Sequence, residues 1–145
     1  PCKKQIIETI TPKEIKTMNK VTKNLKILYA EDEDISFMVL EKIFKTLNPI
    51  KCKGFLNGKD LLSEYQNDND YNIIFLDIQM PVMDGIECLD ELRKINKEVP
   101  IIALTAFAMK DDREKFLCAG FDEYIGKPLN QDELINKINC LFDDK

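Results

Sequence analysis

The sequence predicts a single α/β domain in which helices cover both faces of a parallel β-sheet. Short apolar runs alternate along the chain with longer amphipathic segments, which is the order typical of this fold class. The runs at 73–76 and 101–104 contain no polar residue, as in strands that are buried on both faces. A chain of 145 residues has the length of one domain and can bury a substantial core without disulfides or metals.

Five apolar runs are the predicted strands, and five amphipathic segments between or after them are the predicted helices. The strands are expected at 25–30, 50–55, 73–76, 101–104 and 121–125. The first helix is indicated by apolar residues at helical spacing that should share one buried face, namely Ile35, Val39, Ile43 and Leu47. The second helix is expected over 59–65, with Leu61 and Leu62 facing the core.

The remaining helices carry start or stop signals. The pair Asp84-Gly85 precedes the third helix, in which the apolar positions are Ile86, Leu89 and Leu92. The fourth helix contains Phe116 and Leu117 and should end at Gly120, since glycine is favoured just after a helix. Asn130 should cap the last helix, with Glu133 three residues later and an inward face formed by Leu134, Ile138 and Leu141.

Residues 1–24 differ from the rest and are predicted to be a linker, so that the domain spans 25–145. They are rich in Lys and Thr and have only scattered apolar residues. Thr11-Pro12, with Glu14 nearby, is a helix-start signal and predicts a short helix over about 12–20.

The composition excludes several kinds of chemistry. The chain has no histidine, which rules out Ser-His and Cys-His nucleophiles and His-ligated metals within it. Its net charge of −5 and lack of a basic stripe argue against direct contact with nucleic acid. No apolar stretch is long enough to span a membrane and no signal peptide opens the chain, so we expect a cytoplasmic domain without membrane contact. The five cysteines are widely spaced and are expected to be reduced, small buried side chains.

Polar residues follow four of the five predicted strands, at the point where each strand ends. They are Glu31 and Asp32, Asp77, Thr105, and Lys127. One such residue alone is usually a turn or helix cap, but parallel strands bring all of these to one edge of the sheet. Crowded carboxylates without His or Cys favour a hard cation such as Mg²⁺. A lysine and a hydroxyl suit phosphate oxygens, and Asp77 is placed as a carboxylate nucleophile.

Four segments resemble the receiver domain of two-component response regulators over about residues 25–142. They are KILYAEDED (26–34), IIFLDIQMPVMDG (73–85), ALTAFA (103–108) and YIGKP (124–128). The resemblance implies a flavodoxin-like, doubly wound (βα)₅ sheet with strand order 2-1-3-4-5 and a short N-terminal extension. The A-E-D form of the acidic pair, with the stretch 108–114, is most similar to receivers of hybrid sensor histidine kinases.

The resemblance also implies a role for each matching residue. Asp77 is the phosphoacceptor; Glu31, Asp32, Asp77 and the backbone carbonyl of Gln79 hold Mg²⁺; Thr105 and Tyr124 are the switch residues; and Lys127 pairs with the phosphoryl group. The peptide bond before Pro128 is expected to be cis, as it commonly is in the family. Phe107, two residues after Thr105, is expected to hinder an attacking water and prolong the life of the phosphoryl group.

The implied function is phosphoryl transfer from a phosphohistidine to Asp77, followed by a change in affinity for an output partner that the sequence does not name. The phosphodonor would be a histidine kinase or a histidine phosphotransfer domain. The isolated domain would catalyse only its own phosphorylation and dephosphorylation, and so is no enzyme, whereas the full-length protein could be a histidine kinase. Self-association through the last helix stays open.

Two other classes of function stay open as well. One is a pseudo-receiver, a protein-binding scaffold that takes no phosphoryl group, and the intact set of site residues argues against it. The other is a Mg²⁺-dependent hydrolase of the haloacid-dehalogenase type with Asp77 as nucleophile. Such enzymes have a second Asp two residues later, where this chain has Gln79. The acidic pair could also be a plain helix cap, and the stretch 54–59 departs from a phosphate-binding loop in spacing and in Asp60.

Overall fold

The fold is a five-stranded parallel sheet in the order β2-β1-β3-β4-β5, as the resemblance implied. The computed structural model describes residues 24–106 and 110–143. Its strands are β1 (Lys26–Ala30), β2 (Lys51–Phe55), β3 (Ile73–Asp77), β4 (Ile101–Thr105) and β5 (Glu123–Gly126). The central position of β3 and β4 explains why their sequences contain no alternation, because every residue of both strands is buried.

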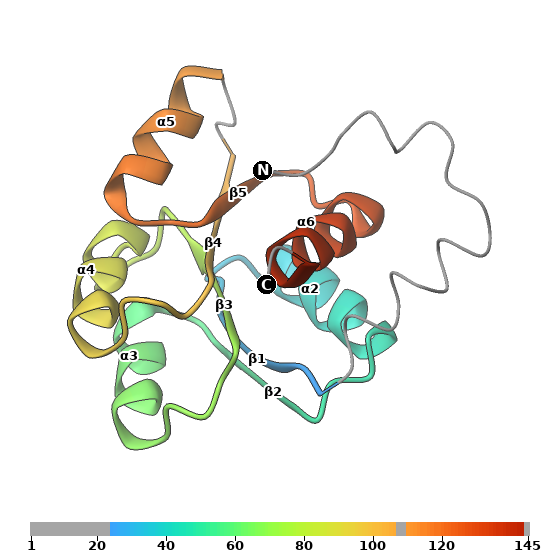
Figure 1. Cartoon of the computed structure of the whole chain (residues 1–145), viewed down its shortest axis with the longest axis horizontal. Helices are drawn as coiled ribbons and strands as arrows, with labels where there is room; N and C mark the ends of the chain where they lie inside the picture. Colours follow the sequence, from blue (N-terminus) through green and yellow to red (C-terminus); the bar gives the residue numbers. More distant parts are fainter. Residues whose placement is uncertain (1–23, 107–109, 144–145) are drawn as a thin grey trace.

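Five helices connect or follow the strands and form a layer on each face of the sheet. They are α2 (Asp34–Thr46), α3 (Gly58–Asn67), α4 (Gly85–Ile95), α5 (Lys110–Ala119) and α6 (Gln131–Asp143). Figure 1 shows α3, α4 and α5 on one side of the sheet and α2 and α6 on the other. Helices thus cover both faces of the sheet, as in a doubly wound α/β fold.

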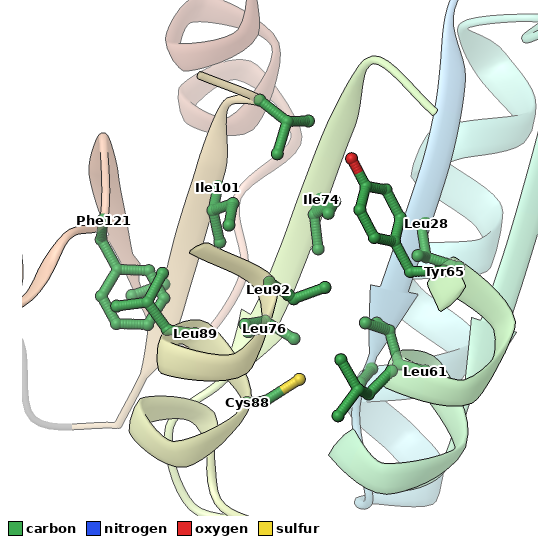
Figure 2. Packing of buried hydrophobic residues seen from close by; sticks show 14 of the residues in the cluster. Leu28, Leu61, Tyr65, Ile74, Leu76, Cys88, Leu89, Leu92, Ile101 and Phe121 are labelled. Carbon is green, nitrogen blue, oxygen red and sulfur yellow. The ribbon is translucent and has the colours of Figure 1, made fainter. Parts of the chain in front are cut away.

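Each helix layer encloses its own apolar core. On the side of α3 and α4, Leu61 and Tyr65 and then Leu89 and Leu92 project from the helices toward the strands (Figure 2). On the opposite side, Leu134 and Ile138 of α6 pack with β1, β3 and β4, as predicted for the inward face of the last helix. The sheet is therefore packed on both faces, and its strand ends form one edge of this packed unit.

The predicted helix starts at Asp84 and Asn130 and the predicted stop at Gly120 are all seen in the structure. Asp84 and Glu87 form a capping box at the start of α4: the Asp84 carboxylate accepts from the backbone N–H of Glu87 at 2.9 Å, and the Glu87 carboxylate accepts from that of Asp84 at 3.3 Å. Asn130 Oδ1 accepts from the N–H of Glu133 at 3.0 Å. Gly120 follows α5 with φ +122°, a value that favours glycine.

The predicted buried face of the first helix was wrong at its N-terminal end. Ile35 is 73% exposed, whereas Leu40 and Phe44 are fully buried. Residues four apart advance by about 40° around a helix of 3.6 residues per turn, so a series of such steps leaves one face. The core therefore lies beneath the later members, and Ile35 points to solvent.

The expectation for the cysteines was also wrong in part. Cys88 is buried, but Cys52 and Cys118 are exposed, because they lie on an edge strand and on the outer surface of α5. Cys140 is disulfide-bonded and so is not reduced. The linker with its helix at about 12–20, and Phe107, lie outside the described residues. Among the described residues, no helix has the length and apolar character needed to cross a membrane.

Candidate functional site

The carboxyl ends of β1, β3 and β4 and the segment after β5 surround an open cleft of about 430 Å³. Its lining residues are Asp32, Glu33, Asp77, Ile78, Gln79, Thr105, Ala106 and Lys127. Glu31 lies beneath them with no exposed surface. The structure thus brings together the polar strand-end residues that the sequence predicted to share one edge.

Lys127 is bound to two carboxylates at once. Its Nζ lies 2.9 Å from Asp77 Oδ2 and 2.8 Å from Glu31 Oε1. The other carboxylate oxygen of Asp77, Oδ1, accepts from the backbone N–H of Gln79 at 3.0 Å. The peptide bond between Lys127 and Pro128 is cis, as the resemblance implied. The lysine, the aspartate and the buried glutamate therefore form one connected charged group.

Burial and the nearby charge of Asp77 shift the pKa values of Glu31 and Asp32. Burial first, and a hydrogen bond with Asp77 second, raise the pKa of Glu31 to about 7. The pKa of Asp32 is raised as well, by partial desolvation and by the charge of Asp77. Burial by itself would lower the pKa of Lys127, but the two carboxylates that it contacts outweigh burial and raise it. The site therefore holds more negative charge than one lysine neutralises.

The three carboxylates suit a divalent cation. Glu31, Asp32 and Asp77 each offer an oxygen within 4.8 Å of the others, so one ion could contact all three. All donors are oxygens, which is the ligand set of hard ions such as Mg²⁺. A positive ion would also relieve the repulsion that raises the pKa of Glu31 and Asp32. The residues present therefore fit Mg²⁺, and the role of the Gln79 carbonyl as a further ligand stays a prediction.

The start of α4 fixes the backbone beside Asp77. The N–H of Gly85 donates to the carbonyl of Ile78 at 2.9 Å. A Cβ atom at Gly85 would lie only 2.5 Å from the backbone oxygen of Asp77, so no larger residue fits without displacing the strand end. The pair Asp84-Gly85 therefore does more than start the helix, because Gly85 also lets the helix start lie against the backbone of Asp77.

The two predicted switch residues occupy different places. Thr105 ends β4, is 3% exposed and lines the cleft. Tyr124 on β5 is half-buried and is not among the lining residues of the cleft. Its ring lies 6.0 Å from that of Phe116 in α5, and Lys137 Nζ lies 5.3 Å from its centroid. Thr105 thus lies at the cleft, whereas Tyr124 lies beside α5 and α6.

Sequence reasoning missed two groups, one at the cleft and one at the start of β5. The backbone N–H of Glu33 donates to Glu31 Oε2 at 3.1 Å and thereby orients the buried acid. Glu123 is buried beside Tyr124 and contacts Lys137 and Arg113. A glutamate within a predicted strand was the available signal for Glu123, because buried acids are rare without cationic partners. No sequence pattern identified Lys137, which looks like an ordinary helical lysine.

Comparison with known proteins agrees with this geometry. Residues 27–139 match the family model described as "Response regulator receiver domain". The chain is 39% identical over 127 residues to "Hybrid signal transduction histidine kinase I" of Dictyostelium discoideum, covering 79% of this chain but only 7% of that protein. It is 28% identical over 123 residues to "Two-component response regulator 24" of Arabidopsis thaliana, covering 85% of this chain and 88% of that protein.

Two solved structures give the same assignment. The receiver domain of the Francisella response regulator 1452 superposes with a TM-score of 0.71 at 35% identity, covering 83% of this chain and 98% of that one. The receiver domain of a Pseudomonas aeruginosa sensor histidine kinase, with a magnesium ion coordinated in its active-site cleft, gives 0.74 at 30% identity and the same coverage. The matched family model, the sheet order and the acidic cleft agree, and the chain belongs to the response regulator receiver domain family of two-component systems.

Proposed function

We propose that this domain accepts a phosphoryl group from a phosphohistidine of a partner onto the carboxylate of Asp77. The observation that carries the proposal is the contact of Lys127 with Asp77 Oδ2 and Glu31 Oε1 at 2.9 and 2.8 Å, at the cleft where three carboxylates gather. This arrangement provides a nucleophile, a cation for phosphate oxygens and a set of magnesium ligands in one place.

In the proposed reaction one oxygen of Asp77 attacks the phosphorus atom. The new O–P bond forms as the P–N bond to the donor imidazole breaks, and the leaving nitrogen keeps the electron pair. The N–H of Gln79 holds the other carboxylate oxygen, which orients the nucleophile. Lys127 is already in contact with Asp77 and can bind a phosphoryl oxygen with a small movement of its flexible side chain.

Glu31, Asp32 and Asp77 would hold Mg²⁺, with the Gln79 carbonyl as an additional ligand. When bound, the ion would neutralise charge on the transferring oxygens. The magnesium ion in the similar Pseudomonas aeruginosa receiver supports this assignment.

Switching would follow from the new charge at Asp77. Thr105 would donate its hydroxyl to a phosphoryl oxygen, and Tyr124 would then change orientation beside it. Such a change would alter the surface formed by α5, β5 and α6 and with it the affinity for an output partner. The domain would be a module of signal transduction that turns over only its own phosphoryl group.

We also infer that the domain belongs to a hybrid histidine kinase and works in the cytoplasm. The supporting fact is that hybrid kinases I and G of Dictyostelium discoideum contain similar segments that make up 7% and 4% of their length. A gene that encodes a kinase dimerisation segment and an ATP-binding domain on the same chain would bear this out. A stand-alone open reading frame would contradict it.

Acetyl phosphate with Mg²⁺, followed by intact-mass analysis, tests the proposed function. The wild type should gain one phosphoryl group, and Asp77→Asn should gain none. Asp84→Asn, which retains a side chain able to cap α4, is the matched control and should gain the group. A wild type that stays unmodified would favour the scaffold, and continuous release of phosphate from an added phosphoester would favour the hydrolase.

A further inference from the structure

A chain of charges crosses the free edge of the sheet at β5. Glu123 is only 8% exposed, and its Oε1 lies 3.2 Å from Lys137 Nζ on α6. Its Oε2 lies 3.9 Å from an Nη atom of Arg113 on α5. Because α5 and α6 cover opposite faces of the sheet (Figure 1), this group of residues connects the two helix layers around the outermost strand.

Lys137 is the closer of the two cations and makes a second contact. Its Nζ lies 5.3 Å from the ring centroid of Tyr124, within the range of a cation–π interaction. Successive residues of a strand point to opposite faces, so Glu123 and Tyr124 project away from each other. Lys137 reaches both of them at the edge and thereby ties the ring to a buried carboxylate.

The place of Tyr124 connects this contact to the cleft. Tyr124 pairs with Ala103 in the register of β4 and β5, and Thr105 lies two residues beyond Ala103 on the same face. Tyr124 is thus a diagonal cross-strand neighbour of Thr105, which lines the cleft. The ring also lies 6.0 Å from that of Phe116 in α5.

The contact with Lys137 exists only while the ring has this orientation. A rotation of Tyr124 would break the cation–π interaction, whereas the ion pair between Lys137 and Glu123 could persist. An interaction that exists in only one of two conformations stabilises that conformation. It shifts the equilibrium by the difference in its interaction free energy between the two conformations. Lys137 therefore favours the state in which Tyr124 lies against α5 and α6.

We propose that Lys137 is a positioning residue of the switch, which holds the Tyr124 ring in its resting orientation and so limits how readily the domain takes up a phosphoryl group. This inference rests on the proposed function, because it requires that Tyr124 changes orientation on phosphorylation. The ion pair with Glu123 holds the Lys137 ammonium group, which makes the cation–π contact with the Tyr124 ring. A residue of α6 thereby contacts the switch residue across the edge strand β5.

Lys137→Met tests the inference, because it removes the charge and keeps a long apolar side chain. Lys137→Arg restores a cation, and Lys115→Met removes an equal charge from an exposed position of α5. The protein is labelled with 3-fluorotyrosine, and the ¹⁹F resonance of Tyr124 is assigned by its loss in Tyr124→Phe. Beryllofluoride with Mg²⁺ serves as the probe for the phosphoryl-bound state.

Without beryllofluoride, Lys137→Met should move the Tyr124 resonance toward its position in the beryllofluoride-bound wild type. Its apparent affinity for beryllofluoride should rise about fivefold, the size expected from loss of one cation–π contact. Lys137→Arg should resemble the wild type, as should Lys115→Met. In a Tyr124→Ala background, Lys137→Met should leave the affinity unchanged, since the effect passes through the ring.

The inference is overturned if Lys137→Met and Lys115→Met have the same Tyr124 resonance and the same affinity while the wild type responds to beryllofluoride. A role in stability alone would lower the unfolding midpoint of Lys137→Met without changing either readout, and would equally overturn it. A wild type that does not respond to beryllofluoride contradicts the proposed function itself, which separates the two failures.

Discussion

Lys127 carries the only side-chain positive charge among the residues that line the cleft, and it faces two acids. Its amino group is already in contact with Asp77, so the proposed transfer needs no large rearrangement to place it. A fixed cation of this kind stabilises charge that develops during transfer. In the proposed reaction, Lys127 is therefore expected to matter more than any other residue of the cleft except Asp77.

Lys127→Met should slow the phosphorylation of Asp77 by about 100-fold, as loss of one preorganised charge does in other active sites. The rate is measured by intact mass during exposure to acetyl phosphate at fixed Mg²⁺. Lys115→Met is the control for a change in net charge and should react at the wild-type rate. Equal rates for both variants would show that Lys127 has no part in the transfer.

Tyr71 and Glu64 make a stabilising contact far from the cleft. The Tyr71 hydroxyl donates to Glu64 Oε2 at 2.7 Å, and Lys53 Nζ lies 3.2 Å from the same oxygen. The hydrogen bond from Tyr71 first, and Lys53 second, hold the pKa of Glu64 below its usual value. A depressed carboxyl pKa stabilises the fold above the unfolded pKa, and this contribution is lost as the pH falls through the folded pKa.

Tyr71→Phe should therefore lower the free energy of unfolding by about 1 kcal/mol near pH 7, and by less as the pH falls through the depressed pKa of Glu64. Urea unfolding over a series of pH values from neutral to acid measures the difference. Tyr124→Phe provides the comparison. Among the hydrogen bonds of the described residues, none joins the Tyr124 hydroxyl to a carboxylate. A cost that is independent of pH would contradict the assigned role of the Glu64 charge.

At the scale of elements, the start of α4 determines the shape of the strand end that carries Asp77. The capping box of Asp84 and Glu87 stabilises the first turn, and Gly85 lets that turn approach the backbone of Asp77. The start of α4 and Asp77 are thus coupled through backbone contact rather than through side chains.

Gly85→Ala should slow phosphorylation and reduce the free energy of unfolding by about 1–3 kcal/mol, because the new Cβ displaces backbone. Asp84→Ala should cost about 1 kcal/mol through loss of the cap, while phosphorylation stays near the wild-type rate. The two variants weaken the same helix start, and comparing their phosphorylation rates isolates the effect on Asp77. If Gly85→Ala reacts like Asp84→Ala, the close approach has no effect on the site.

The sequence predicted all five described helices and the strands because each has a local signal: an apolar run, a cap or a glycine stop. It could not predict that Ile35 is exposed, since the buried face of a helix depends on where the sheet lies beneath it. The exposure of Cys52 likewise follows from the edge position of β2, which is a property of the strand order.

At the scale of the whole molecule, parallel topology assembles the site from residues nearly one hundred positions apart. The residue types at the strand ends were enough to predict which side chains meet, because the carboxyl ends of parallel strands share an edge. The bond of Lys127 to both Glu31 and Asp77, and the contact of Lys137 with Tyr124, were beyond prediction. They depend on side-chain directions that packing sets, and sequence spacing carries no record of these.

The crowded acids make a prediction for the molecule as a whole. A cation that binds the folded state but not the unfolded state stabilises it, by about 2.7 kcal/mol at 100 times its dissociation constant. Mg²⁺ should therefore raise the thermal midpoint of the wild type and have little effect on Asp32→Asn or Asp77→Asn. Asp90→Asn, at an exposed position of α4, should respond like the wild type. An equal response of all four proteins would argue against a magnesium site at Asp32 and Asp77.

Transfer from a phosphohistidine is the most direct test of the central claim. An isolated histidine phosphotransfer domain that carries ³²P on its histidine is mixed with the wild type, Asp77→Asn or Asp84→Asn in the presence of Mg²⁺. Label should leave the donor and appear on the wild type and on Asp84→Asn as an acyl phosphate that hydroxylamine releases, and Asp77→Asn should stay unlabelled. Absence of transfer to the wild type from a panel of such donors, or labelling that persists in Asp77→Asn, would contradict the account.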